Sequence, residues 1–439
     1  MTSSNNSIPK IIVVGGGAGG LELVTKLGRK LGRKGKADVT LVDNTRTHIW
    51  KPLLHEVAAG TLDSHQDEIE YLGQAKYNGF HFRLGKMDGL DRDNKTISMA
   101  ATLNAEGLEI IPSRTFDYDY LIIAVGSISH DFGIAGVAEH CLFLDTTRQA
   151  EHFQRQLLEA YVRAHTQERP IDDGQLDIAI VGAGATGVEL SAQLHEVSHL
   201  LSTYGLDEVK PTDVKISIIE AADRVLPGLP EKLSRATEIE LAKLGVDVLT
   251  DERVIEVTAD EIRTESGKVV PAAIKVWAAG IKAPTFLMEL GLATNRINQI
   301  EVKQTLQSLT DDDIYAIGDC AACPWEGHEG NVPPRAQAAH QMASLAYKSI
   351  TRRLAGKSIP DYHYHDHGSL VSLGKYSTVG NMMGSLSKGS LMIEGFLARM
   401  MYLSLYKMHQ VALFGFFRVG MLSLSHLFRR SVHPKIKLH

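Results

Sequence analysis

The sequence predicts an α/β fold in which two parallel-sheet domains are followed by a C-terminal helical segment. A β-branched strand, a glycine loop, a helix and a second strand follow one another twice along the chain, which is the order of a βαβ unit. The length of 439 residues suits two or three domains. Residues 395–439 differ in composition from everything before them. These three observations define the expected architecture.

The composition excludes several classes of protein. A net charge of −6, with 22% charged residues, argues against a nucleic-acid-binding protein. Three cysteines are too few for a disulfide framework. Residues 1–10 lack the apolar stretch of a signal peptide, and no run of 18 apolar residues predicts a membrane-spanning helix. We therefore expect a reducing, cytoplasmic setting.

The first glycine loop follows a strand at 11–14 and opens a predicted helix that ends near Leu31. Its G-x-G-x-x-G pattern consists of Gly15, Gly17 and Gly20. Glycines permit a tight turn and close approach of a pyrophosphate, and the helix N-terminus offers free N–H groups to the phosphates. Asp43 ends the next strand, 39–42, where a carboxylate can bind ribose hydroxyls. Together these features favour a dinucleotide site over a glycine turn that binds nothing.

The second glycine loop follows a strand at 178–181 and repeats the pattern in Gly182, Gly184 and Gly187. Glu220 closes the following strand, 216–219. The sequence separation between Gly187 and Glu220 is longer than the usual ~20 residues. We expect a longer helix and an excursion at 202–212 to fill the gap. An acid at this strand end favours NADH because it would repel the 2′-phosphate of NADPH, although Arg224 lies near enough to weaken that inference slightly.

Two such Rossmann-like units in one chain resemble the two-dinucleotide-binding-domain flavoproteins, in which the first site holds FAD and the inserted second site holds NAD(P)H. The segment 118–126 is similar to the strand that returns the chain from the FAD domain toward the NADH domain, and the segment 314–319 is similar to the late FAD motif. The resemblance implies that Asp319 binds the ribitol chain and that Gly318 lets the backbone reach the cofactor. It adds three further cofactor-binding residues, Ala124, Gly126 and Gly280.

The cysteines separate the members of this superfamily. Disulfide reductases carry a redox cysteine pair beside the flavin, and the corresponding segment here, 50–56, contains none. Sulfide–quinone reductases need separated cysteines near the flavin, and Cys141 has no evident partner. Cys320 and Cys323 directly follow Asp319 and have no metal-ligating neighbours, so we interpret them as buried side chains rather than a redox pair or a metal site.

A glutamine pair points to the electron acceptor. Two prolines, 333–334, predict a helix that starts near Arg335, because proline fits only the first helical turn. Gln337 and Gln341 are four residues apart and share a helix face, which Ala336 and Ala338 keep shallow. The segment resembles the A-Q-x-A-x-Q quinone motif of type II NADH:quinone oxidoreductases, the non-pumping NADH dehydrogenases. A solvated helix face is the alternative reading.

Glu189 is a further candidate, two residues past Gly187 and expected in the first turn of its helix. Its counterpart in the family lies near the flavin and nicotinamide, so the resemblance implies a role in positioning and proton handling. The alternative is a helix-start carboxylate that the helix dipole favours. His340 could relay protons, but an ordinary helical histidine is the simpler interpretation.

The segment 395–439 contains no Asp or Glu and seven Lys or Arg, so it carries +7 and the rest of the chain, −6 minus 7, carries −13. Basic and bulky apolar residues together predict helices that lie on an anionic membrane surface. Gly415 and Gly420 are expected to break the segment into two helices. A buried packing or dimer helix is the alternative.

The expected organisation is an FAD-binding domain at 1–140 and 286–350, an NADH-binding domain at 141–285 and a membrane-anchoring domain at 351–439. The resemblance implies a peripheral enzyme on the cytoplasmic face of the inner (plasma) membrane that passes two electrons from NADH via FAD to ubiquinone or menaquinone without pumping protons. A homodimer is left open. The competing readings are an NADH-dependent reductase of ferredoxin or rubredoxin, and a flavin- and NADH-binding sensor.

Overall fold

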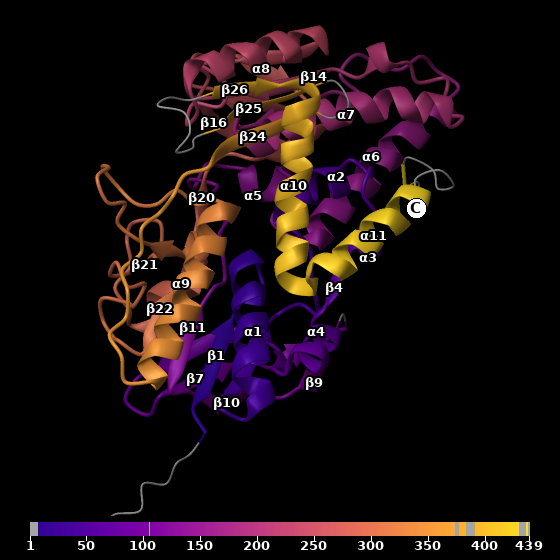
Figure 1. Cartoon of the computed structure of the whole chain (residues 1–439). Coiled ribbons are helices and arrows are strands. Elements are labelled where there is room, and N and C mark those ends of the chain that lie inside the picture. Colours follow the sequence, from indigo (N-terminus) through magenta and orange to yellow (C-terminus); the bar gives the residue numbers. More distant parts are fainter. Residues whose placement is uncertain (1–7, 105, 374–376, 383–390, 430–435, 438–439) are drawn as a thin grey trace, which may run out of the picture. The chain divides into compact units, whose positions relative to one another are not determined.

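The computed structural model describes residues 8–104, 106–373, 377–382, 391–429 and 436–437 (Figure 1). Side chains are described for 8–104, 106–373, 404–425, 428 and 436–437. The chain forms two compact units. The first unit comprises Met1–Trp50, Glu68–Ile128 and Ile281–His365, and the second comprises Lys51–Asp67, Ser129–Gly280 and Asp366–His439. Residues 51–67, which we expected in the first domain, therefore belong with the second unit.

A five-stranded parallel sheet forms the centre of the first unit, in the order β22-β11-β1-β2-β5. These strands are β22 (Ile314–Ala316), β11 (Tyr120–Ile123), β1 (Lys10–Val14), β2 (Asp38–Asp43) and β5 (His81–Leu84). The four residues 11–14 are all buried, as expected of a strand covered on both faces. Val14 pairs with Val42 and with Ile123, so the carboxyl ends of three strands meet at one edge of the sheet.

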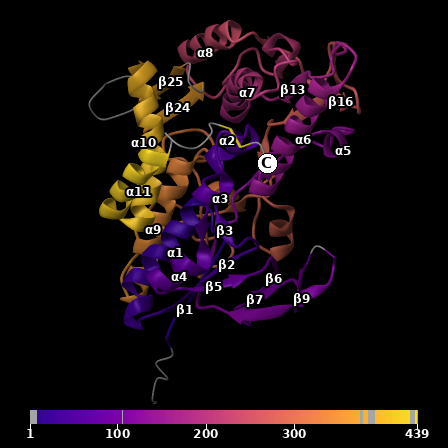
Figure 2. The same cartoon turned by 90° about the vertical axis from the view of Figure 1, so that its right-hand side faces the viewer.

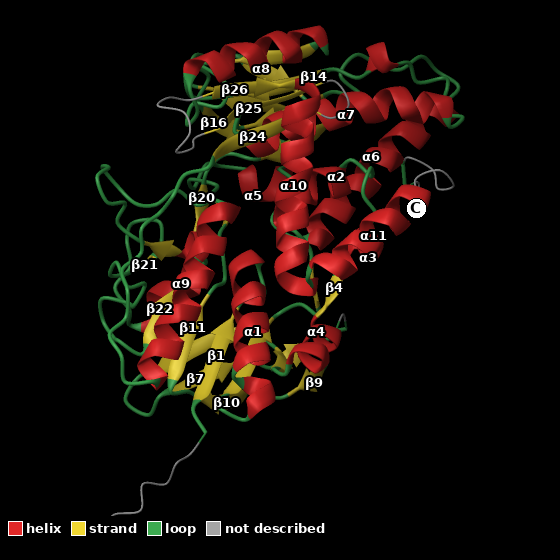
Figure 3. Ribbon diagram, in the orientation of Figure 1, coloured by secondary structure: helices red, strands yellow, loops and turns green. Residues whose placement is uncertain are grey.

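Helices α1 (Ala18–Lys30), α4 (Tyr71–Asn78) and α9 (Ala336–Leu354) accompany this sheet (Figure 3). Helix α1 packs against both α4 and α9. At Gly28 a Cβ would lie 2.7 Å from the Asn78 carbonyl oxygen, so the close approach of α1 to the end of α4 requires glycine. The first unit also contains β3 (Thr47–His48), β4 (Ile69–Glu70), β6 (Met87–Asp91), β7 (Thr96–Met99), β8 (Thr102–Leu103), β9 (Glu109–Ile111), β10 (Arg114–Asp117), β21 (Ile300–Glu301), β23 (Ala321–Ala322), and the 3₁₀ helices η1 (Gly32–Lys34), η4 (Thr285–Leu290) and η5 (Gly318–Cys320). Two short strands, β12 (Ile128–Ser129) and β20 (Ile281–Lys282), stand where the chain changes unit.

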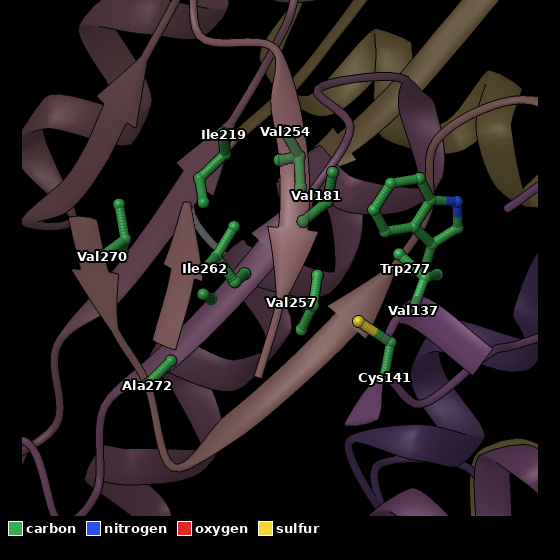
Figure 4. Close-up of a cluster of buried hydrophobic side chains, with 11 residues drawn as sticks. Val137, Cys141, Val181, Ile219, Val254, Val257, Ile262, Val270, Ala272 and Trp277 are labelled. Atoms are coloured by element: carbon green, nitrogen blue, oxygen red, sulfur yellow. The ribbon is translucent and has the colours of Figure 1, made fainter. Parts of the chain in front are cut away.

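The second unit repeats the parallel arrangement with a four-stranded sheet in the order β15-β14-β13-β19. Its strands are β13 (Ile178–Val181), β14 (Ile216–Ile219), β15 (Val246–Leu249) and β19 (Ile274–Trp277). An antiparallel sheet of β16 (Val254–Val257), β17 (Glu261–Thr264) and β18 (Val269–Pro271) contributes to the same core. There Val181 and Trp277 meet Val257 and Ile262 in one buried cluster (Figure 4).

The second unit also contains helices. They are η2 (Lys51–Leu53), α2 (Leu54–Ala58), α3 (Ser64–Asp67), α5 (Val137–His140), α6 (Thr147–Thr166), α7 (Ala185–Thr203), η3 (Pro211–Asp213) and α8 (Glu231–Lys243). Helix α6 begins with a capping box between Thr146 and Gln149. Helix α7 and η3 occupy the long gap before β14, as the sequence predicts. Helix α2 packs against both α6 and α7, which explains why residues 51–67 belong to this unit.

The C-terminal part consists of the antiparallel sheet β24 (Gly368–Leu373), β25 (Ser377–Met382) and β26 (Leu391–Glu394), then α10 (Gly395–Phe414) and α11 (Phe416–Arg429). Helix α10 runs beside β24 and β25 in both views (Figures 1 and 2). Gly415, at φ +82°, separates the two helices as expected, whereas Gly420 lies inside α11 and does not end it. Within the described residues, no helix is both long and apolar enough to span a bilayer.

Candidate active site

The first glycine loop connects β1 to α1 and leaves no room for side chains at two of its three glycines. Gly15 has φ +101°, and a Cβ there would lie 2.4 Å from the Ala124 carbonyl oxygen. At Gly20 a Cβ would lie 1.9 Å from the Gly15 carbonyl oxygen. Gly17 caps α1, and its nearest neighbour would be 4.0 Å away. The loop thus presents bare backbone at the N-terminus of a helix, which suits a pyrophosphate.

Asp43 ties the end of β2 to this loop. Its Oδ2 accepts the Gly16 N–H at 2.6 Å, and its Oδ1 accepts the N–H and hydroxyl of Thr45 at 2.8 and 2.7 Å. An acid held at this strand end is placed as a ribose ligand would be.

Two buried side chains that the sequence analysis missed support the same loop. The Tyr71 hydroxyl donates to the Gly16 carbonyl at 2.9 Å, and His48 Nδ1 lies 2.9 Å from that oxygen. Burial lowers the pKa of His48 to about 4, so the ring is neutral at pH 7. Neither residue belongs to a sequence pattern, because both reach the loop through tertiary packing.

The other expected FAD residues follow β11 and β22, neighbours of β1 in the sheet. Ala124 donates its N–H to the Val14 carbonyl at 2.7 Å. Gly126 and Gly318 have φ of +69° and +73°, which favours glycine at both. The Asp319 carboxylate accepts the Ser127 hydroxyl at 2.8 Å. The structure therefore brings the predicted residues of the first unit to the carboxyl edge of one parallel sheet, the usual place for a dinucleotide.

Helix α9 begins at Ala336 with Arg335 as its N-cap, as the proline pair predicts. Ala338 is buried, whereas Ala336, Gln337 and Gln341 are half-buried. The Gln341 amide forms two hydrogen bonds with the backbone of His365, donating at 2.8 Å and accepting at 3.0 Å. Gln341 therefore holds the backbone of His365, the last residue of the first unit, next to α9. The sequence pattern does not reveal this role.

His340, on the same helix, has a carboxylate partner. Its Nδ1 contacts the buried Glu22 of α1. The contact joins the helix that follows the first glycine loop to the helix that carries the two glutamines.

The second glycine loop is built like the first. Gly182 has φ +106°, and a Cβ on Gly187 would lie 2.0 Å from the Gly182 carbonyl oxygen, whereas nothing lies within 4 Å of a Cβ on Gly184. Glu220 Oε2 accepts the Ala183 N–H at 2.7 Å, just as Asp43 accepts an N–H of the first loop. The two loops therefore share the same backbone geometry and the same contact with a carboxylate.

Three residues near this second loop have defined surroundings. Glu220 Oε1 accepts the Ala222 N–H at 2.9 Å, which fixes the other carboxylate oxygen. Arg224 donates to the Pro227 carbonyl at 3.1 Å. Gly280 has φ +67°, and a Cβ there would lie 2.4 Å from the Phe132 ring.

Glu189 is the fifth residue of α7 and lies just beyond the first turn, in which the sequence analysis placed it. The first-turn expectation is wrong, because α7 already starts at Ala185. The dipole effect is confined to the first turn and does not account for this carboxylate. It is buried, its Oε1 accepts the Ser372 N–H at 3.0 Å, and its Oε2 lies 3.6 Å from His55 Nδ1. His55 is another residue that the sequence analysis passed over.

The three cysteines are buried free thiols. Burial raises the pKa of Cys320 to about 11 and the pKa values of Cys141 and Cys323 to about 12. Thiols this weakly acidic do not form the reactive thiolate at pH 7. The structure therefore agrees with reading Cys320 and Cys323 as packing side chains, and the described residues contain no cluster of potential metal ligands.

Helix α11 exposes large apolar side chains. Phe416 and Phe417 are 84% and 83% exposed, and Met421, Leu424 and Phe428 are exposed on the same helix. Arg418, also exposed, adds a positive charge among them. The basic side chains of Arg399, Arg429, Arg430 and Lys435, which also carried the membrane prediction, lie outside the described residues.

Known proteins share this organisation. A model of the pyridine nucleotide-disulphide oxidoreductase family matches residues 9–343. A type II NADH:quinone oxidoreductase of Haemophilus influenzae is 41% identical over 98% of this chain and 99% of its own length. A type II NADH:quinone oxidoreductase of Staphylococcus aureus is 31% identical over 85% of this chain and 90% of its own length.

Solved structures show the same fold. An NDH2 of Plasmodium falciparum in complex with NADH superposes with a TM-score of 0.82 at 20% identity, covering 98% of this chain and 100% of its own. A sulfide:quinone oxidoreductase of Aquifex aeolicus superposes with a TM-score of 0.73 at 18% identity, covering 93% and 92%. With the sequence relatives above, and with two glycine loops each tied to an acid, the chain belongs to the type II NADH:quinone oxidoreductases of the pyridine nucleotide-disulphide oxidoreductase family.

Proposed function

We propose that this chain passes two electrons from NADH through FAD to a membrane quinone. Its relatives are named type II NADH:quinone oxidoreductases. The observation that carries the proposal is the pair of similarly built glycine loops, one in each unit, each with a carboxylate bonded to a loop N–H. One chain can then bind two different dinucleotides at the same time. The class of the final acceptor follows from the family.

The first unit fits FAD. Gly15 and Gly20 keep the loop narrow, and the N-terminus of α1 would hold the pyrophosphate. Asp43 would bind the ribose hydroxyls, and Asp319 would bind the ribitol chain. When bound, FAD supplies a ring that accepts a hydride and passes two electrons on. The protein contributes binding, orientation and the surrounding charges.

The second unit fits NADH. The backbone at Gly184 would contact the pyrophosphate, and Glu220 would accept hydrogen bonds from the two ribose hydroxyls. The 2′-phosphate of NADPH would face this carboxylate and be repelled. Arg224, which could have offset the repulsion, donates to a backbone carbonyl of its own loop.

Reduction of a quinone to a quinol takes up two protons with the two electrons, so the protein needs a group that handles protons. We assign this role to Glu189, a buried carboxylate held by the Ser372 N–H. The face of α9 with Gln337 and Gln341, kept shallow by Ala336 and Ala338, is the proposed quinone contact.

The quinone comes from lipid, and we propose peripheral attachment to the cytoplasmic face of the inner membrane. The exposed apolar side chains of α11 support attachment to a membrane surface. Phe416 and Phe417 can insert below the headgroups, while the positive charge of 395–439, to which the exposed Arg418 contributes, attracts anionic lipid. Replacing both phenylalanines with serine should release the protein from anionic vesicles in a flotation assay. The matched control replaces Leu103 and Leu108, which are exposed on the first unit, with serine and should leave flotation unchanged.

Steady-state NADH oxidation tests the acceptor class. We expect the purified protein to turn over rapidly with a soluble short-chain quinone and slowly with ferredoxin or rubredoxin. Turnover only with the protein acceptors would support the reductase alternative. Binding of NADH without turnover on any acceptor would support the sensor alternative.

A further inference from the structure

The middle residue of the first glycine loop is held on both sides of its backbone. The Gly16 N–H donates to Asp43 Oδ2 at 2.6 Å. The Gly16 carbonyl oxygen lies 2.9 Å from the Tyr71 hydroxyl and 2.9 Å from His48 Nδ1. All four residues belong to the first unit. Two side-chain groups therefore converge on one backbone oxygen, which has two lone pairs to accept hydrogen bonds.

Both side chains are donors at pH 7. Burial, and after it the negative charge of Asp43, raises the pKa of Tyr71 well above its usual value, so the hydroxyl keeps its proton. The hydroxyl also interacts with Asp43 and Thr45, but the Asp43 carboxylate already accepts the N–H of Gly16 and the N–H and hydroxyl of Thr45. Burial lowers the pKa of His48 to about 4, and because the Gly16 carbonyl can only accept, the neutral ring carries its N–H on Nδ1.

Neighbouring elements hold the two donors in place. Strand β3, which ends at His48, pairs with β4. The N–H of Tyr71, the first residue of α4, donates to the Arg46 carbonyl at 3.1 Å. The Tyr71 ring packs against Phe82 of β5, with the ring centroids 5.2 Å apart. The position of each donor is thus set by contacts that do not involve the Gly16 carbonyl.

The carbonyl of Gly16 and the N–H of Gly17 belong to one peptide group. That peptide is trans and planar, so its N–H points away from the side to which its C=O points. Gly16 is buried and its carbonyl faces Tyr71 and His48, whereas Gly17, the N-cap of α1, is exposed. Fixing the carbonyl therefore directs the Gly17 N–H outward, to the side on which a pyrophosphate would contact the N-terminus of α1.

The second glycine loop has the same arrangement with a different donor. Ala183, its middle residue, donates its N–H to Glu220 at 2.7 Å, and its carbonyl accepts the Leu226 N–H at 2.8 Å. Both loops therefore have an acid on the N–H of the middle residue and a donor on its carbonyl. In the second loop the donor is backbone, whereas in the first loop both donors are side chains that substitution can remove.

We propose that Tyr71 and His48 are positioning residues for FAD: by holding the Gly16 carbonyl, they turn the Gly17 N–H toward the pyrophosphate. The inference rests on the proposed FAD site of the first unit. Either donor alone still holds the carbonyl. Loss of both donors lets the peptide rotate and weakens one hydrogen bond to a charged phosphate, so FAD binding should depend on the two side chains jointly.

Substitutions remove the two donors separately. Tyr71→Phe deletes the hydroxyl and keeps the ring against Phe82. In His48→Gln the amide reaches the position of Nε2 and leaves no donor at Nδ1, whereas in His48→Asn the amide N–H takes the place of Nδ1–H. Tyr77→Phe is the matched control, because this tyrosine lies on the same helix and is 62% exposed. Gly17→Ala tests the FAD site itself, because a Cβ there would have no protein atom closer than 4.0 Å but would lie where the pyrophosphate approaches.

Serial dilution of the full-length, FAD-loaded proteins, followed by flavin fluorescence, measures the Kd for FAD, and urea unfolding measures stability. Tyr71→Phe and His48→Gln should each raise the Kd about threefold. The double variant Tyr71→Phe/His48→Gln should raise it about 10- to 100-fold, more than the product of the single effects. Tyr71→Phe/His48→Asn should match Tyr71→Phe, and Tyr77→Phe should keep the parental Kd. If the Gln double variant does not fold, the comparison of Tyr71→Phe with Tyr77→Phe decides.

Two results would overturn the inference alone. The first is a parental Kd in Tyr71→Phe/His48→Gln, whatever its stability, while Gly17→Ala weakens FAD binding; the two side chains would then have a purely structural role. The second is an equal rise of the Kd in the Asn and Gln double variants, which would show that the donor at Nδ1 does not matter. A parental Kd in Gly17→Ala would instead remove the proposed FAD site from this loop, and the inference with it.

Discussion

The second glycine loop permits a prediction in which two glycines of one motif respond differently to the same methyl group. Gly184 has extended backbone, at φ −71° and ψ −177°, and nothing lies within 4 Å of a Cβ placed there. Gly184→Ala should therefore change the free energy of unfolding by less than about 0.5 kcal/mol. In Gly187→Ala the Cβ would lie 2.0 Å from the Gly182 carbonyl oxygen, so α7 has to shift. We expect that variant to lose about 1–3 kcal/mol of stability.

Both Gly184→Ala and Gly187→Ala should weaken the binding of NADH. A methyl group at Gly184 displaces the pyrophosphate and costs one charge-assisted hydrogen bond, about 1.5–3 kcal/mol, or roughly 10- to 100-fold in the Kd for NADH. Urea unfolding followed by tryptophan fluorescence, to which the buried Trp277 contributes, measures stability. Fluorescence titration with NADH measures affinity.

The control is Gly228→Ala, because nothing lies within 4 Å of a Cβ at that position either. It should keep both stability and NADH affinity. The FAD content of all three variants should match the parent, because the first glycine loop belongs to the other unit. Parental NADH affinity in Gly184→Ala would show that the pyrophosphate does not approach this loop, and the assignment of the second site would then be wrong.

Three further predictions follow from single contacts. Glu220→Ser removes the carboxylate that would repel a 2′-phosphate, so the ratio of kcat/KM for NADH over NADPH should fall by about tenfold or more, and an unchanged ratio would refute the assigned role. Burial lowers the pKa of His48 from 6.5 to about 4, so the unfolded chain binds a proton between these pH values that the folded chain does not. The contribution of His48 to the free energy of unfolding is constant above pH 6.5, and up to about 3 kcal/mol of it should be lost as the pH falls to 4. Urea unfolding across this range should show that the free energy of unfolding of His48→Gln depends less steeply on pH than that of the parent. Gln341→Ala removes two hydrogen bonds with the His365 backbone, so urea unfolding should show a loss of about 1–3 kcal/mol, and a loss below about 0.5 kcal/mol would contradict the contact.

The sequence predicts the glycine loops and their acids because they depend on local rules. A β-branched strand, a glycine turn and a helix are encoded within about 20 residues, and the acid follows at the end of the next strand. Gly15, Gly20 and Gly187 lie where a side chain would collide with backbone. Such steric requirements restrict these positions to glycine, and the pattern of glycines can be read from the sequence. The start of α9 at Ala336 is equally local, because a proline pair sets it.

Features that depend on tertiary packing could not be predicted. His48 and Tyr71 approach the first loop from positions 32 and 55 residues away in sequence. The contact of His55 with Glu189 requires α2 to pack on α7, and no periodicity in the sequence encodes that packing. Glycine inside a helix costs only about 1 kcal/mol, so α11 continues through Gly420 while the left-handed Gly415 ends α10.

The central claim is that two electrons pass from NADH through FAD to a quinone, and an anaerobic titration of the purified protein tests it most directly. One equivalent of NADH per FAD should bleach the flavin absorbance completely, and one equivalent of a short-chain quinone should restore it. Failure of NADH to bleach a bound flavin would contradict the two-site reading. Complete bleaching followed by no reoxidation with quinone would contradict the assigned acceptor.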